Sequence, residues 1–130
     1  MNVSKIAKKG LLYTQTGTPY YASPEVWKDM PYNAKSDIWS AGCVIYEMAA
    51  LKPPFTASDM SQLYQRVIRG QFARVPSGYS QDFHDVIKCM LRVDPAERPT
   101  CAQILKLQSV QKYLPEAMKQ QVRQTLSVQT

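Results

Sequence analysis

The sequence predicts a mainly α-helical fold, because three features of its 130 residues agree. From residue 36 onward, apolar residues recur at spacings of three and four, which places them on one face of a helix. Residues that cap or end helices bound each of these windows. No window alternates apolar and polar residues with the period of two that a half-buried strand shows. We therefore expect helices preceded by a coiled segment of about 35 residues, a length that is unusual unless the segment is functional or mobile.

The first predicted helix covers residues 36–51. Ser36 can cap its start, and its body, IWSAGCVIYEMAAL, is apolar on nearly every face. A helix that is apolar all round is typical of the centre of a protein rather than its surface. Lys52-Pro53-Pro54 ends the helix, since proline cannot continue the backbone hydrogen bonds.

Two amphipathic helices are predicted next. Ser58 or Asp59 can cap the first and Gly70 supplies a left-handed stop, while Ser80 can cap the second. The apolar stripes are Met60, Leu63, Tyr64, Val67 and Ile68 in the first, and Phe83, Val86, Ile87, Met90 and Leu91 in the second. The only histidine, His84, lies inside the second helix and reads as a surface or half-buried residue rather than a catalytic one.

A short turn and a further helix follow. In Asp94-Pro95-Ala96-Glu97 the aspartate caps and the proline takes the first helical position. Thr100 opens T-C-A-Q, which has the form of a capping box. Residues 115–130 carry a narrow apolar stripe at Met118, Val122 and Leu126, for which we favour a C-terminal tail over a docked helix.

Composition and charge argue against several classes of protein. The net charge of +6 comes from the two ends of the chain, and no stripe of arginine and aromatic residues favours a nucleic-acid partner. The longest apolar run, residues 38–51, is shorter than the roughly 20 residues that cross a bilayer, and MNVSKIAKKG lacks the apolar core of a secretory signal. Three scattered cysteines and one histidine predict buried reduced thiols and no metal site.

Four motifs together resemble a known family. They are GTPYYASPEVW at 17–27, KSDIWSAGCVIYEM at 35–48, PF at 54–55 and RVDPAERPT at 92–100. In this order they resemble the second half of a protein kinase catalytic domain, with Ser23-Pro24-Glu25 in place of the A-P-E element. The SPEVW form, the 35–51 helix and the opening NVSKIAKKG are similar to NIMA-related (Nek) serine/threonine kinases. The resemblance covers residues 1–114 and implies a partial C-terminal kinase lobe, from the end of the activation segment onward, without the N-terminal lobe.

The resemblance implies structural roles for three charged residues. Glu25 and Arg98 would form a buried ion pair, although their separation in the sequence gives no reason to pair them. Asp37 would brace the catalytic loop, which is not part of this sequence; the plainer interpretation is an acidic residue that compensates the dipole of the 36–51 helix.

The resemblance also implies roles for the activation segment. Gly17, Thr18, Pro19, Tyr20, Tyr21 and Pro24 would form the substrate-docking floor, with Thr18 close to the acceptor hydroxyl. Thr14, and secondarily Thr16, would carry the activating phosphate. The arginine that usually receives this phosphate is missing, and Lys5, Lys8 and Lys9 are weaker point-charge substitutes.

The residues that would transfer phosphate are not in this sequence. It contains no G-x-G-x-x-G, V-A-I-K, H-R-D or D-F-G motif, so we expect no catalytic residue here and no binding of ATP or magnesium by this chain alone. For the intact parent the resemblance implies ATP, magnesium and protein substrates with serine or threonine acceptors, in the cytoplasm or, by family alone, at the cytoskeleton or centrosome.

Three interpretations remain open. The chain is a piece of a Nek-like kinase in which Met1 is an internal methionine, or a non-catalytic module that binds or competes with a kinase or regulator partner, or a nonfunctional remnant. Sequence upstream of Met1 would separate the first from the others.

Overall fold

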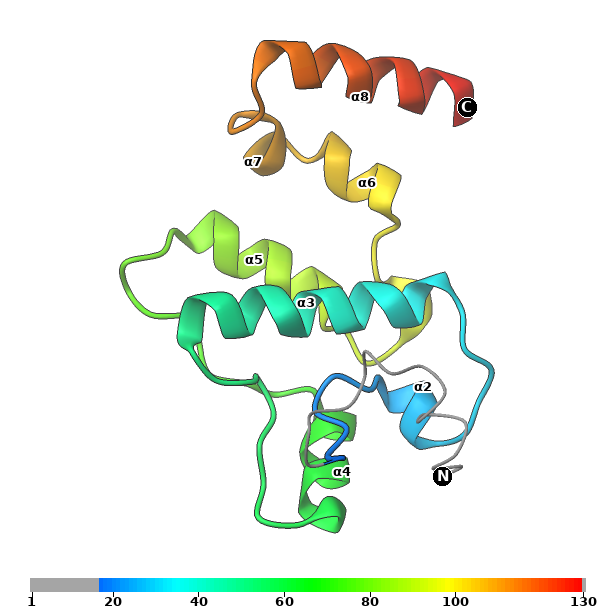
Figure 1. The fold of residues 1–130 in the computed structure, drawn as a ribbon, viewed down its shortest axis with the longest axis vertical. Coiled ribbons are helices and arrows are strands. Elements are labelled where there is room, and N and C mark those ends of the chain that lie inside the picture. Colours follow the sequence, from blue (N-terminus) through cyan, green and yellow to red (C-terminus); the bar gives the residue numbers. More distant parts are fainter. Residues whose placement is uncertain (1–16, 130) are drawn as a thin grey trace. The chain divides into compact units, whose positions relative to one another are not determined.

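The computed structural model describes residues 17–129, in which every regular element is a helix. It divides into two compact units, one ending at Arg98 and the other beginning at Pro99. The helices of the first unit are α2 (Pro24–Trp27), α3 (Ala34–Ala50), α4 (Met60–Arg69), α5 (Gln81–Met90) and the 3-10 helix η1 (Pro95–Glu97) (Figure 1). Those of the second are α6 (Cys101–Lys106), α7 (Gln108–Gln111) and α8 (Glu116–Gln129). The predicted mainly α-helical class is confirmed.

Helix α3 begins earlier than the sequence predicted. Asn33, not Ser36, is its N-cap, and the Asn33 side chain accepts hydrogen bonds from the backbone N–H groups of Lys35 and Ser36 at 2.8 and 3.3 Å. The hydroxyl of Ser36 accepts from the Asn33 N–H at 3.3 Å, which completes a capping box. The prediction of Ser36 as cap is wrong because an asparagine three residues upstream satisfies two free N–H groups at once.

The other predicted helix ends agree with the structure. Asp59 caps α4, Ser80 caps α5 and Thr100 caps α6, each accepting a backbone hydrogen bond three residues on. Gly70 ends α4 in the left-handed conformation, with φ of 67°. The coil expected before residue 36 is interrupted by the short helix α2, which Ser23 caps.

Aromatic side chains form the centre of the first unit. The rings of Trp39 and Phe55 stack with centroids 5.4 Å apart, and Phe72 meets Phe55 and Tyr46 edge-on at 5.9 and 5.6 Å. The Tyr46 hydroxyl donates to the carbonyl of Ala73 at 2.8 Å, so this buried phenol keeps a hydrogen bond. The cluster fixes the segments after α3 and α4 against the α3 helix.

Helices α3 and α5 run alongside each other (Figure 1) and approach closely at Gly42. A methyl group at this glycine would lie 3.0 Å from Cβ of Met90 and 3.1 Å from Cδ2 of Leu91. Because Gly42 has no side chain, the end of α5 packs directly on the middle of α3. The loop that follows α5 and leads to Arg98 then contacts α3 as well.

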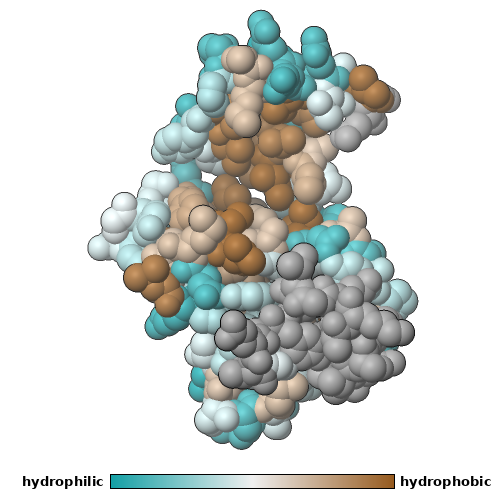
Figure 2. All heavy atoms as spheres, in the orientation of Figure 1, coloured by the Kyte–Doolittle hydropathy of each residue, from teal (hydrophilic) through white to brown (hydrophobic). Residues whose placement is uncertain are grey.

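Only one face of α3 is buried, which differs from the expected central helix. Ile38, Trp39, Cys43 and Tyr46 are inside, whereas Val44, Met48 and Leu51 are 45%, 73% and 87% exposed. Figure 2 shows hydrophobic surface over this helix on the face turned toward the viewer. A helix that is apolar all round is typical of a protein's centre, and the described part of this chain, which resembles only half of a kinase lobe, covers one side of it.

The second unit contains a regular helix where a tail or a frayed helix was expected. Residues 116–129 form α8, which begins with the Lys119 N–H donating to the carbonyl of Pro115 at 2.9 Å. Its sequence, EAMKQQVRQTLSVQ, is rich in strong helix formers, and Lys119 pairs with Glu116 at 3.3 Å. The narrow apolar stripe indicated a tail, whereas the high helix propensity of these residues indicates the helix that forms.

The three cysteines are free thiols with different exposures. Cys43 is buried, as predicted, Cys89 is half-buried, and Cys101 is exposed. The prediction of burial is wrong for Cys101 because it occupies the first turn of α6, directly after an exposed cap. No helix within residues 17–129 is long and apolar enough to cross a membrane.

Gly70 allows a precise test of the packing between α4 and the Arg98 loop. Its positive φ would cost an alanine about 1–2 kcal/mol. An added Cβ would lie 2.4 Å from Cγ2 of Val93, an overlap that costs a further 1–3 kcal/mol or so. We expect Gly70→Ala to lower the free energy of unfolding in urea by the sum of these costs. Gly78→Ala is the control, since nothing lies within 4 Å of that position; equal stability of the two variants would contradict this packing.

Candidate functional site

Residues 17–23 form a turn that leads into α2. Gly17 has φ of 84° and is exposed, so a glycine is required there for conformation rather than for space. The Tyr20 N–H donates to the carbonyl of Thr18 at 3.0 Å, and the Ala22 N–H to that of Pro19 at 3.4 Å. Pro19 and Ala22 are buried while Tyr20 and Tyr21 are half-buried, so the turn presents its tyrosines at the surface.

Helix α3 holds this turn through two polar contacts. The Ser40 hydroxyl donates to the carbonyl of Tyr21 at 2.9 Å, and the Tyr21 hydroxyl donates to the Glu47 carboxylate. Burial, together with the hydrogen bond and charge of Glu47, raises the pKa of Tyr21 to about 12. Tyr21 therefore keeps its proton as a donor throughout the physiological range, and the position of the turn is fixed relative to α3.

Glu25 and Arg98 meet in a buried bidentate ion pair. Nη1 of Arg98 donates to Oε2 of Glu25 at 2.7 Å, and Nη2 donates to Oε1 at 2.8 Å. The Ser36 hydroxyl donates to the same Oε2 at 2.8 Å. Glu25 is 5% exposed and Arg98 is 1% exposed, so this contact joins the first and last parts of the unit inside the core.

Every N–H of the Arg98 guanidinium has an acceptor. Besides Glu25, they donate to the backbone carbonyls of Arg92 at 2.7 Å, Lys35 at 2.8 Å and Val93 at 3.2 Å. This uses all five donors of the group, which explains how a charge can be buried here without a large penalty. The guanidinium also lies 5.1 Å from the centre of the Trp39 ring, and the Lys35 ammonium donates to the Arg98 carbonyl.

The hydrogen bonds outweigh burial at Glu25. Burial alone would raise the pKa of its carboxyl, but the hydrogen bonds from Arg98, the backbone and Ser36, with the charge of Arg98, lower the pKa below its ordinary value. Glu25 is therefore ionised at neutral pH, as a bidentate partner of arginine must be.

The other predicted residues are placed less closely together. Asp37, in the first turn of α3, is exposed, and its carboxylate has no hydrogen-bond or ion-pair partner among residues 17–129. Thr14 and Thr16 lie outside the described residues. No group of three or more His, Cys, Asp or Glu within the described part of the chain could hold a metal ion.

Sequence reasoning missed four residues that hold the site: Lys35, Ser36, Ser40 and Glu47. Ser36, Ser40 and Glu47 recur at spacings of four and seven along α3, so they share the face that meets residues 17–25. This polar spacing within an apolar helix was the available signal. Lys35 acts through its backbone carbonyl and its flexible ammonium, for which no sequence signal exists.

Replacing Arg98 tests whether the ion pair supports the 17–27 segment. Arg98→Ala leaves the Glu25 carboxylate buried without its partner, so we expect a loss of about 3–5 kcal/mol in the free energy of unfolding. Urea unfolding followed by the fluorescence of Trp27 and Trp39 measures it. Arg123→Ala, at an exposed arginine of α8, is the matched control. If the urea unfolding curve of Arg98→Ala equalled that of the wild type, the pair would have no structural role.

The ionisation of Glu25 also predicts a pH dependence. Because its pKa is lower in the folded than in the unfolded chain, its stabilising contribution is complete above the ordinary value of 4.5 and is lost as the pH falls through the folded pKa. We expect Glu25→Gln to be less stable than the wild type at pH 7 and to lose less stability on acidification from pH 6 to pH 3. Parallel stability curves for the two proteins over that range would contradict this prediction.

Comparison with known proteins matches the sequence of this chain to a family. A family model described as the protein kinase domain matches residues 2–110. Serine/threonine-protein kinase Nek5 of Homo sapiens is 40% identical over 114 residues, which are 88% of this chain and 16% of the relative. Nek2 of Homo sapiens is 46% identical over 93 residues (72% and 21%), and probable nek2 of Dictyostelium discoideum is 44% identical over 104 residues (79% and 25%).

The chain thus spans between 16% and 25% of the length of these three relatives. The match covers the turn at residues 17–23, α3 and the loop of Arg98, which are the parts that the buried ion pair joins. The chain belongs to the protein kinase family, among its NIMA-related (Nek) serine/threonine members.

Proposed function

We propose that this chain is the substrate-docking and activation-segment part of a Nek-like serine/threonine kinase. The parent would transfer the γ-phosphoryl group of ATP, with magnesium, to a serine or threonine hydroxyl of a protein substrate. The observation that carries the proposal is the attachment of residues 17–25 to the folded unit. Two contacts to α3 and the Glu25–Arg98 pair hold this turn in one position, as a platform for positioning a peptide must be.

The proposed docking surface is formed by Gly17, Thr18, Pro19, Tyr20, Tyr21 and Pro24. Within this segment Pro19 and Pro24 are fully buried and act as supports, so the half-exposed Tyr20 and Tyr21 with Gly17 and Thr18 present the surface itself. Aromatic rings and the backbone of a turn can support an extended peptide by apolar contact and hydrogen bonding. In this arrangement Thr18, next to the exposed Gly17, would lie nearest the acceptor hydroxyl.

Asp37 would brace a catalytic loop that another part of the kinase supplies. Its exposed carboxylate, without a partner among the described residues, is free to accept backbone N–H groups. A carboxylate that accepts two such hydrogen bonds fixes a loop more firmly than a neutral acceptor would.

The exposed face of α3 would be covered in the parent kinase. Val44 and Met48 lie four residues apart on this helix, Leu51 is its C-cap, and the three are 45%, 73% and 87% exposed. A contiguous apolar surface of this kind marks an interaction site. We propose that the preceding residues of the kinase lobe pack there, beside Asp37.

The described residues do not fit a nucleotide–magnesium site. They offer no cluster of carboxylates or histidines for a metal, and the sequence has no glycine-rich loop for phosphates. We therefore derive no phosphoryl-transfer step within this chain and propose that it is inactive alone. Thr14 and Thr16 remain the proposed sites of activating phosphorylation, which would add nearly two negative charges.

From family membership we propose that the kinase acts on protein substrates and binds kinase or regulator partners, and that it binds neither nucleic acid nor membrane. We also propose an intracellular, cytoplasmic location, with the centrosome suggested only by analogy to the family. The alternatives of a competitor module or a nonfunctional remnant are addressed by the same experiment.

A chimeric kinase tests the proposal. Residues 17–114 replace the matching segment of human Nek2, and transfer of labelled phosphate from ATP to a serine-containing peptide is measured, with the alanine version of the peptide as substrate control. We expect the chimera to transfer phosphate and the 130-residue chain alone to transfer none. Asp37→Ala in the chimera should lower turnover about a hundredfold by displacing the catalytic loop. Asp82→Ala, on the exposed surface of α5, should leave turnover unchanged.

Two outcomes would overturn the proposal. A chimera that folds but transfers no phosphate would favour the remnant, or a binding module if the purified chain still captures a kinase partner. Transfer by the chain alone would contradict the assignment of catalysis to residues outside it.

A further inference from the structure

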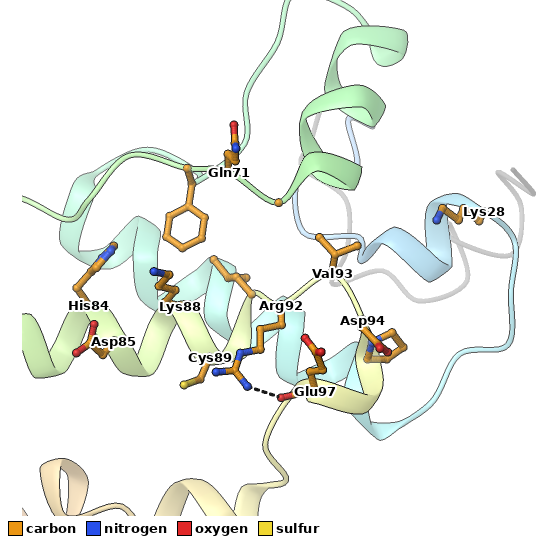
Figure 3. Close-up of a pocket in the computed structure, with 14 residues that line it drawn as sticks. Lys28, Gln71, His84, Asp85, Lys88, Cys89, Arg92, Val93, Asp94 and Glu97 are labelled. Carbon is orange, nitrogen blue, oxygen red and sulfur yellow. Dashed lines mark hydrogen bonds between the residues drawn. The ribbon is translucent and has the colours of Figure 1, made fainter.

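A groove of about 930 Å³ opens in the first unit, apart from the docking turn. One wall is the face of α5 that carries His84 and Lys88, and the opposite wall is the Gly70–Phe72 segment that follows α4. Figure 3 shows the His84 and Lys88 side chains rising from α5 toward the segment that contains Gln71. The groove shares Arg92 and Val93 with the surroundings of the Glu25–Arg98 pair, since their backbone carbonyls accept from Arg98, but the phosphoryl-transfer proposal does not use it.

The charges of the groove are unequally available. Three cations and three carboxylates line it, but the Asp94 carboxylate caps η1 by accepting from the Ala96 N–H at 2.9 Å. Asp85 accepts from Nε2 of Gln81 at 2.9 Å. Lys88 has no hydrogen bond or ion pair among residues 17–129, so its ammonium is available to a ligand. The Glu97 carboxylate likewise has no partner among these residues, so it is the Lys88 side of the groove, on α5, that is suited to a negative charge.

An apolar surface adjoins that free ammonium. The half-buried Phe72 ring lies 5.9 Å from the His84 ring, and the buried Leu91 lies at the base of the groove. The Nδ1 atom of His84 is buried and has no hydrogen-bond partner in the described part of the chain. Between Phe72 and Lys88 the groove thus offers an apolar contact and a cation, while the unpartnered His84 nitrogen lies beneath its surface.

We propose that this groove binds a short peptide segment of a partner protein that places an acidic side chain beside an apolar one. The acidic group would pair with Lys88, and the apolar side chain would cover Phe72. The volume and the two facing walls suit several residues of extended chain, whereas charged walls of both signs do not suit a mainly apolar small molecule. The three carboxylates around the groove disfavour a polyanion such as nucleic acid.

Selection from a random octapeptide library displayed on phage tests this inference with the full 130-residue chain as target. We expect the selected peptides to share an aspartate or glutamate next to a leucine or an aromatic residue. A fluorescein-labelled copy of the most enriched peptide should bind Lys88→Ala about tenfold more weakly than the wild type, because one charge-assisted hydrogen bond is lost. It should bind Lys88→Glu more weakly still, because the new carboxylate repels the acidic side chain of the peptide. Binding should also weaken in high salt.

Lys52→Glu is the matched control, because it makes the same charge change at an exposed residue beyond the end of α3. The buried Cys43 reports folding in every variant, since its thiol should resist alkylation while the exposed Cys101 reacts. Selected peptides without an acidic residue, or equal binding to wild type and Lys88→Glu, would overturn the proposal. So would inorganic phosphate displacing the peptide at millimolar concentration, which would indicate a simple anion site. None of these outcomes bears on the chimera experiment.

Discussion

The structure of the first unit depends on one buried charge pair. Arg98 gives two hydrogen bonds to Glu25 and three to backbone carbonyls, so a single guanidinium joins α2, the start of α3 and the loop after α5. Such a pair adds little net stability compared with apolar packing, but leaving either partner alone is costly. We propose that its main effect is specificity, because residues distant in sequence must meet in one arrangement, which also fixes the turn at residues 17–23 that precedes Glu25.

The two faces of α3 have different roles in this unit. Its buried face supplies the aromatic core, and its polar residues Ser36, Ser40 and Glu47 attach the turn that would receive a substrate. The other face leaves Val44, Met48 and Leu51 exposed. A helix that organises one half of a kinase lobe in this way would also be the surface on which the other half assembles, which links the proposed function to the stability of the chain.

Local chemistry made most helices predictable from sequence. Asp59, Gly70, Ser80 and Thr100 act within three residues of themselves, so their roles can be read directly from the chain. The Glu25–Arg98 pair could be anticipated only through family resemblance, because no periodicity connects positions so far apart. The extent of α3 burial could not be predicted, since apolarity shows what a face prefers and not whether the chain covers it. The groove was likewise hidden, because its walls come from segments that meet only on folding.

A double-mutant cycle on Glu25→Gln and Arg98→Met would measure how strongly the two side chains depend on each other. Free energies of unfolding at pH 7 for the wild type, both single variants and the double variant give the coupling between the two side chains without assigning their separate desolvation costs. The account predicts a favourable coupling of about 2–3 kcal/mol, near the upper end for residues in one hydrogen-bonded network. Additive single and double variants, with a coupling near zero, would contradict it and would leave the docking turn without its proposed support.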